Sequence, residues 1–357
     1  MVAALEPVDR IEVTSDEAGL FLVAGSFEPR SVRATTLLDG NLDRAVVFSY
    51  DDTLDTETGR RNTRQIDASL RGMSQSVEVL RCQVADPFSV VSAFHTYVTR
   101  ERLVGAVRSV VLDATCFTKL HLLLLLRFLR DWLGVETTRI CYTKPLVYAT
   151  AFGKELSYGI RKTVYLPYCG TETPGAGTGL IALLGHEPRR LERLVQEIEP
   201  DLCVVLMGEP GFTEDMAAYS RKANASLIRR AAYDRHYQLA VAPADDIERC
   251  VDVLVKQIRG LREDGCGGIF VAPLGTKLQA LAVDLLSQRN ETGRLSLAYA
   301  VPDRYERRNY SHGFGETVET MFATRMVGSA AGIRPIPAGG AVVTDDDVNA
   351  LRDELGV

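Results

Sequence analysis

The chain has 357 residues, of which 46% are apolar and 25% charged, and its formal charge is −6. This composition is typical of a folded globular protein and excludes an intrinsically disordered chain. The length favours two domains, because single hydrophobic cores stop growing near ~250 to 300 residues. The acidic total argues against binding bulk nucleic acid or anionic membranes through overall charge.

Cysteine usage and the apolar runs indicate a cytoplasmic protein. The seven cysteines are scattered without any Cys-x-x-Cys pair, and several lie in apolar segments. We interpret them as small core residues in a reducing compartment. Residues 1–18 lack the apolar run of a signal peptide, and the apolar run at 120–126 is too short to span a membrane.

Short apolar segments alternate with helical patterns after a leader over residues 1–18. Strands are expected at residues 20–24, 45–50, 77–84, 107–112 and 138–142, with helices between them. Wholly apolar strands that alternate with helices indicate a parallel sheet buried on both faces. Right-handed crossovers then give a doubly wound, Rossmann-like α/β unit, predicted to cover residues 19–169.

The same order begins again after residues 170–179, whose glycine-rich composition predicts a linker. The second Rossmann-like half is predicted at residues 180–315. Its strands are expected at 180–184, 202–207, 238–242 and 268–272, and a fifth ends near Tyr299. Residues 316–357 are predicted to form a helical tail, with one helix near residues 318–326.

Matched motifs indicate that the two halves are copies of one unit. Motifs recur in the same order between 157 and 159 residues apart. They pair Glu28-Pro29-Arg30 with Glu187-Pro188-Arg189, Thr118-Lys119 with Thr276-Lys277, and a tyrosine motif at Tyr142 with one at Tyr299. Collinear matches at one offset predict a tandem duplication with pseudo-two-fold symmetry.

The paired motifs follow the predicted strands, where open parallel sheets bind ligands beside helix N-termini. Lysines and arginines there would contact an anionic ligand, tyrosines would stack or close the cleft, and Ser26 and Thr276 would donate hydrogen bonds. The sequence therefore predicts a nucleotide-like or phosphorylated ligand in a cleft between the halves. The expected ligand-binding residues are Ser26, Glu28, Arg30, Thr118, Lys119, Tyr142, His186, Arg189, Gly275, Thr276, Lys277, Tyr299 and Tyr305.

Each motif also has a structural interpretation. Glu-Pro-Arg is a good helix start, because proline suits the first turn and glutamate complements the dipole. The tyrosine motif could be aromatic packing at a strand exit, the lysines could be solvated, and a single histidine such as His186 is more often a local hydrogen-bonding group than a base.

Catalysis is the first alternative function. No complete catalytic, metal-binding or cofactor-binding signature is present, and Asp113 or Glu187 is the candidate general base if the protein is an enzyme. A structural subunit of a larger complex is the second alternative.

The segment Ala272-Pro273-Leu274-Gly275-Thr276-Lys277 resembles the strand-to-helix ligand motif of CARF-type (CRISPR-associated Rossmann-fold) sensor domains. The related SAVED sensors fuse two such units in one chain. The resemblance implies binding of a cyclic oligonucleotide across the junction, a regulatory role in antiviral defence, and a partner that is an effector protein or a second copy. The first copy departs from the motif, with Phe117 in place of the glycine.

Overall fold

Five parallel strands form the centre of each of two sheets in this computed structural model, which describes residues 5–13, 19–50, 56–148, 156–169, 177–288, 293–306 and 309–323. The first sheet has the order β8 (Thr137–Thr143), β7 (Ser109–Asp113), β3 (Phe21–Gly25), β5 (Leu42–Tyr50) and β6 (Ser74–Cys82). The second has the order β16 (Leu295–Val301), β15 (Cys266–Pro273), β12 (Gly177–Leu183), β13 (Leu202–Gly208) and β14 (Tyr237–Ala242). Both orders are those of a doubly wound unit, so the predicted fold class is confirmed.

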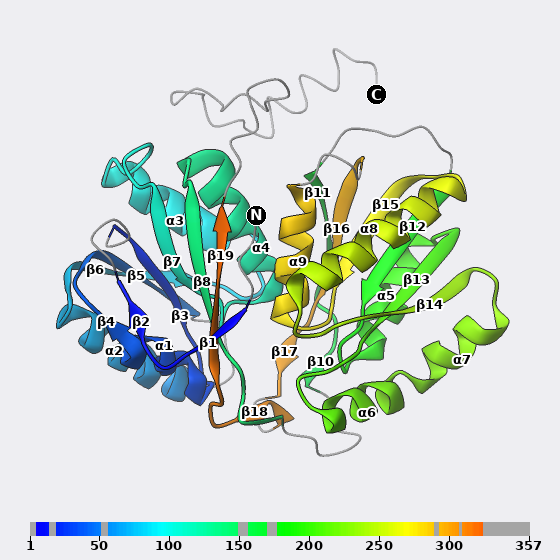
Figure 1. Cartoon of the computed structure of the whole chain (residues 1–357), viewed down its shortest axis with the longest axis horizontal. Helices are drawn as coiled ribbons and strands as arrows, with labels where there is room; N and C mark the ends of the chain where they lie inside the picture. Colours follow the sequence, from blue (N-terminus) through cyan, green and yellow to red (C-terminus); the bar gives the residue numbers. More distant parts are fainter. Residues whose placement is uncertain are drawn as a thin grey trace, which may run out of the picture. The chain divides into compact units, whose positions relative to one another are not determined.

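Helices connect the parallel strands, as the alternating pattern predicts. In the first half they are α1 (Arg33–Leu37), α2 (Thr56–Arg71), α3 (Ser89–Arg100) and α4 (Lys119–Phe128), with short helical turns at Pro29–Val32 and Leu129–Leu133. In the second half they are α5 (Pro188–Ile198), α6 (Glu214–Ala223), α7 (Ala225–Tyr233), α8 (Ile247–Glu263) and α9 (Lys277–Ser287). Helices α4 and α9 pack against each other between the two sheets (Figure 1).

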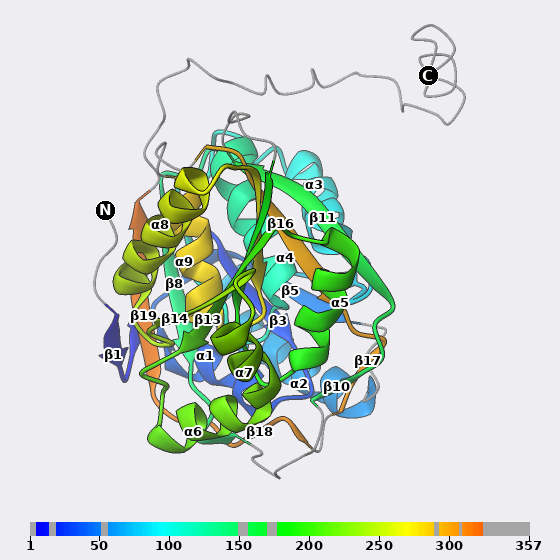
Figure 2. The ribbon, with the colours of Figure 1, turned by 90° about the vertical axis from the view of Figure 1, so that its right-hand side faces the viewer.

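Each half gives its last strand to the sheet of the other half. Strand β11 (Lys162–Cys169) follows the first half in the chain, yet it lies antiparallel beside β16 of the second sheet. Strand β19 (Thr317–Ala323) follows the second half and lies antiparallel beside β8 of the first sheet, as Figures 1 and 2 show. The registers match as well, with Val164 opposite Tyr299 and Val318 opposite Tyr142.

Two short arms are exchanged in the same way. The first consists of β9 (Val147–Tyr148) and β10 (Ser157–Tyr158), and the second of β17 (Arg304–Tyr305) and β18 (Ser311–His312). Strand β9 pairs with β18, and β10 pairs with β17, both antiparallel. The arm that follows the first half thus contacts the arm of the second half, and the arm that follows the second half contacts the arm of the first.

The predicted segment boundaries need correction because of this exchange. The predicted first half, 19–169, includes β11, which belongs to the second sheet. The predicted leader contains β1 (Glu6–Val8), which pairs with β19, and β2 (Ile11–Glu12), which pairs with β4 (Leu38–Asp39). The predicted linker, 170–179, overlaps β12 from Gly177, and its residues 170–176 lie outside the described residues.

The helix predicted near residues 318–326 is wrong where the structure describes it, because residues 317–323 form β19. Val318, Thr320 and Phe322 are buried, as expected for one face of a strand. A polar threonine at the middle inward position hides the two-residue period, so the apolar pair four residues apart mimics a helix. The rest of the predicted tail, 324–357, lies outside the described residues.

Candidate functional site

One pocket lies where the loops after β3, β7, β12 and β15 meet the two arms, and its cavity volume is about 180 Å³. A single water needs ~15 Å³ by the same measure, so the space suits a small-molecule ligand. In each sheet the pocket lies where the strand order reverses, which is where doubly wound folds bind ligands. The predicted residues that line it are Ser26, Glu28, Arg30, Thr118, Lys119, Tyr142, His186, Glu187, Gly275, Thr276, Lys277, Tyr299 and Tyr305.

Arg189, a predicted ligand residue, does not line the pocket; Arg190 takes its place. Helix α5 starts at Pro188, and its turn leaves Arg189 exposed while Arg190 is only 4% exposed. The Arg190 guanidinium forms an ion pair with Glu187 at 3.4 Å and donates to the carbonyl oxygen of Ala300 at 3.0 and 2.7 Å. It also lies over the Tyr299 ring, 4.6 Å from the centroid.

The first half repeats this cluster. Arg30 forms an ion pair with Glu28 at 2.8 Å and donates to the Thr143 carbonyl oxygen at 3.0 Å. It donates to the Tyr142 hydroxyl at 3.2 Å and lies 5.7 Å from the centroid of that ring. The arginine is two residues from its glutamate here and three in the second half, because Pro29 opens a 3-10 turn whereas Pro188 opens an α-helix. That difference explains why matching the sequence motifs selected Arg189.

Each glutamate also accepts a hydrogen bond from a serine of the arm that follows the other half. Ser311, which follows the second half, donates its hydroxyl hydrogen to Glu28 of the first. Ser157, which follows the first half, donates to Glu187 of the second. The sequence contains the signal for this pair, since each serine is followed two positions later by glycine, but spacing alone does not say which half each serine contacts.

These contacts keep Glu28 ionised. Burial alone would raise the pKa of the Glu28 carboxyl, but the charges of Arg30 and Lys277 and the Ser311 hydrogen bond hold it below its ordinary value. A carboxylate with these partners is a fixed negative charge and a poor proton carrier at neutral pH.

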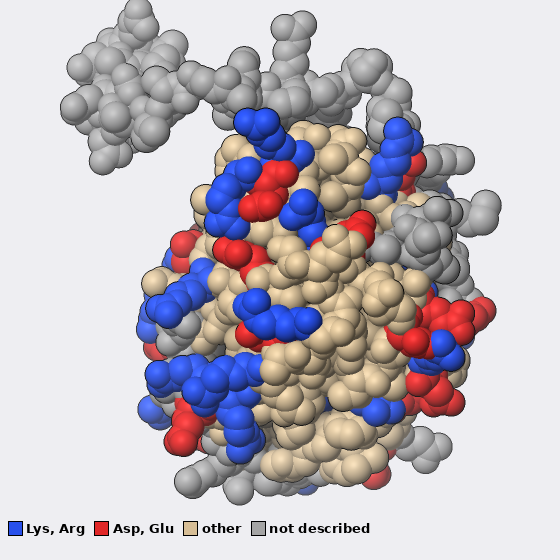
Figure 3. All heavy atoms as spheres, turned by 90° about the vertical axis from the view of Figure 1, so that its left-hand side faces the viewer, with Lys and Arg blue, Asp and Glu red and all other residues tan. Residues whose placement is uncertain are grey.

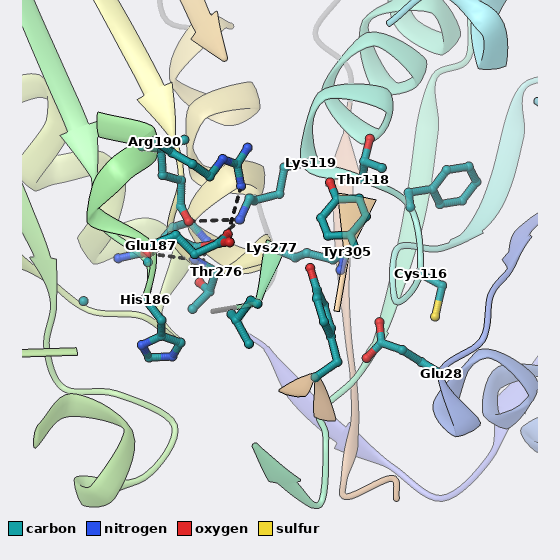
Figure 4. A pocket seen from close by; sticks show the side chains of 18 of the residues that line it. Glu28, Cys116, Thr118, Lys119, His186, Glu187, Arg190, Thr276, Lys277 and Tyr305 are labelled. Atoms are coloured by element: carbon teal, nitrogen blue, oxygen red, sulfur yellow. Dashed lines mark hydrogen bonds and ion pairs between the residues drawn. The ribbon is translucent and has the colours of Figure 1, made fainter. Parts of the chain in front are cut away.

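Two lysines begin the helices that face the pocket, and they differ in their contacts. Thr118 caps α4 and Thr276 caps α9, the latter through a capping box with Gln279. The Lys119 ammonium crosses to the second half and donates to the carbonyl oxygens of Leu274 at 3.0 Å and Gly275 at 2.6 Å. Figure 4 shows Lys119 and Lys277 between the Glu187–Arg190 pair and Glu28.

Lys119 and Lys277 are both partly buried, but they differ in what surrounds their ammonium groups. Burial, followed by the nearby charges of Arg190 and Lys277, holds the pKa of Lys119 well below its usual value, although Glu187 acts in the opposite direction. Lys277 is only partly buried, and its charge lowers the pKa of Glu28 across the pocket. The Lys119 ammonium already donates to two backbone carbonyl oxygens, so of the two lysines it is the one engaged within the protein.

Asp113, a predicted general base, does not line the pocket. Its side chain is 1% exposed, Oδ1 accepts from the Thr115 backbone N–H at 2.9 Å, and Oδ2 has no hydrogen-bond partner within the described ranges. Burial raises the pKa of Asp113 to about 6, although Thr115, Arg30 and Lys277 lower it. The carboxyl belongs to the strand end behind the site.

His186 lines the pocket beside the Tyr219 ring, with a centroid distance of 4.8 Å. Burial lowers its pKa to about 4, with a smaller lowering by Lys119 and an opposing effect of Glu187. The imidazole is neutral at pH 7 and adds no charge to the site. No group of three His, Cys, Asp or Glu side chains in the described part of the chain could hold a metal ion.

Comparisons with known proteins show a remote structural similarity. No family model matches the chain, and no curated protein matches it. A solved structure described as a type III CRISPR defence DNA nuclease activated by cyclic oligoadenylate is similar over 78% of this chain, with 11% identity and a TM-score of 0.46. The similarity spans 65% of that nuclease chain. Among the described residues, no helix is long and apolar enough to cross a membrane.

Proposed function

We propose that the chain binds an anionic, nucleotide-like small molecule in this pocket and acts as a ligand sensor or regulatory subunit. One observation carries the proposal: each half brings an Arg–Glu–Tyr cluster and a helix-start lysine to the same pocket. A ligand bound there touches both halves, so its binding energy can change how they are held together. The partner of such a subunit would be an effector protein or a second copy.

Charge supports an anionic ligand. The pocket is lined by four basic side chains, Arg30, Lys119, Arg190 and Lys277, against two carboxylates, Glu28 and Glu187. Helices α4 and α9 add the positive ends of their dipoles and their free N–H groups. The face that carries α2 and β6 instead has basic and acidic side chains interspersed (Figure 3), which favours binding in the pocket over binding on that surface.

Aromatic side chains support a ligand that also carries a flat ring. Tyr142, Tyr299, Tyr305 and Tyr310 line the pocket, and the last two meet edge to face with centroids 5.7 Å apart. Aromatic faces provide stacking surfaces for bases of any sequence. Phosphate and base together define a nucleotide-like molecule.

The contacts favour binding over catalysis. Glu187 lines the pocket, but it is engaged by Arg190 and Ser157, and Asp113 lies outside the pocket wall. Glu187 remains the candidate base of the alternative, an enzyme acting on a nucleotide or phosphorylated substrate.

Isothermal titration of AMP, ATP and cyclic dinucleotides into wild type, Lys277→Met and Lys162→Met tests the proposal. Lys162 is exposed on β11 and serves as the matched control. Loss of a charge-assisted contact at Lys277 should weaken binding ~10- to 100-fold, with no change for the control. Binding of none of these nucleotides, or equal binding by Lys277→Met, would refute the proposal. Product formation that Glu187→Gln abolishes would indicate an enzyme instead.

A further inference from the structure

Tyr50 and His121 form a buried pair at one wall of the pocket. Tyr50 is the last residue of β5 and lines the pocket, and His121 lies in the first turn of α4. The rings stack with centroids 5.5 Å apart, and the Tyr50 hydroxyl lies 2.9 Å from His121 Nδ1. His121 Nε2 lies 2.8 Å from the Asp86 carbonyl oxygen.

These contacts determine where the protons lie. A backbone carbonyl can only accept, so His121 carries a hydrogen on Nε2. His121 is 1% exposed, and in the imidazole tautomer with its hydrogen on Nε2 the Nδ1 atom is an acceptor. The Tyr50 hydroxyl therefore donates to His121, while its oxygen accepts from the Thr118 backbone N–H. The phenol oxygen has one acceptor position left and no hydrogen left to donate.

The second half has no equivalent group. Gly208 is the last residue of β13, as Tyr50 is of β5, and Gln279 follows its helix cap by three residues, as His121 does. The Gln279 side-chain amide is committed to the Thr276 backbone N–H and to the carbonyl oxygens of Ala242 and Pro243. A Cβ on Gly208 would lie 3.4 Å from Gln279 Nε2, so the glutamine amide packs directly beside this position.

We infer that Tyr50 determines ligand specificity by accepting a hydrogen bond, so the ligand group over the first half must carry an N–H or O–H donor. This inference rests on the proposed function. It adds that the two halves recognise the ligand differently, although their arginine clusters match. Such a ligand carries a hydroxyl or amino group where it contacts the first half. No such donor is required where it contacts the second half.

Donor-deleted analogues test this inference. The probes are AMP, 2′-deoxy-AMP, 3′-deoxy-AMP and purine riboside monophosphate, which lacks the 6-amino group, titrated into wild type and Tyr50→Phe. One analogue should bind wild type ~3- to 10-fold more weakly than AMP, and Tyr50→Phe should bind AMP and that analogue equally. Tyr310→Phe, a second pocket tyrosine, is the control and should keep the discrimination.

Three outcomes would overturn the inference. If Tyr50→Phe keeps the wild-type discrimination, or wild type binds all four probes equally, Tyr50 does not select a donor. If Tyr50→Phe weakens every probe by the same factor, the hydroxyl has a structural role only. In these cases nucleotide binding itself survives, whereas binding of no nucleotide at all refutes the proposed function together with the inference.

Discussion

Lys119 donates a 2.6 Å hydrogen bond to the carbonyl oxygen of Gly275, joining the helix start of one half to the glycine loop of the other. Gly275 lies in the Gly-Thr-Lys segment that also contains Lys277. Lys119 of the first half therefore supports the loop that positions Lys277 of the second half. The two lysines occupy matching sequence positions and have different roles.

Replacing Lys119 should therefore affect stability. Lys119→Met leaves the carbonyls of Leu274 and Gly275 without this donor, and we expect the free energy of unfolding to fall by ~1 to 2 kcal/mol. Urea denaturation followed by circular dichroism measures the change, with Lys162→Met as the exposed control. An unchanged midpoint would show that the bridge is energetically neutral.

The two adjacent arginines of α5 should behave very differently. Arg190→Lys loses both hydrogen bonds to Ala300 and the planar contact with Tyr299, so we expect ~2 kcal/mol of destabilisation and weaker nucleotide binding. Arg189→Lys, on the exposed face, should stay within ~0.5 kcal/mol of wild type. Equal effects of the two changes would contradict the assignment of Arg190 to the site.

Asp113 should make stability fall as pH rises from about 4 to 6. Its folded-state pKa of about 6 lies above the ordinary value of 3.8 for an aspartate, so the folded state binds the extra proton in that window. Above this pH window, the buried carboxylate charge lowers the free energy of unfolding by up to ~3 kcal/mol. Asp113→Asn should remove this pH dependence and raise stability at pH 7 without loss of nucleotide binding. Unfolding midpoints between pH 4 and 8 measure the effect, and loss of binding would place Asp113 in the site after all.

Glu28 should act in the opposite direction. Its folded-state pKa is lowered, so its contribution to stability is present above the ordinary value of 4.5 for a glutamate and is lost as pH falls through the folded-state value. Ser311→Ala removes one cause of that shift, and we expect ~1 kcal/mol lower stability at pH 7 with a smaller difference in acid. Acid titration of the thermal midpoint tests this, and a difference that grows toward low pH would contradict it.

Much of the fold could be predicted from the sequence, because most of the parallel strands in the described ranges contain an apolar run with clear ends. The exchanged antiparallel strands β11 and β19 could not. Strand β19 alternates as Val318, Thr320 and Phe322, and its polar middle residue removes the apolar signal. The exchange of strands between the halves leaves no signal in the local sequence, because it depends on which sheet has an edge where the strand can pair.

The lining of the pocket could be predicted in part for the same reason. Glycines, lysines and tyrosines at strand ends mark a ligand edge, and most of the predicted residues line one pocket. The choice between Arg189 and Arg190 depends on the type of helical turn, which the motif does not specify. The role of Tyr50 depends on His121 and on the Asp86 carbonyl, which are brought together only by the fold.

The strand exchange has a consequence for how the protein could be divided. A cut between Cys169 and Gly177 separates the two halves of the sequence but not the two sheets. The N-terminal fragment would carry β11, which completes the other sheet, and would lack β19, which completes its own. Each fragment would therefore carry a strand that pairs with the sheet of the other.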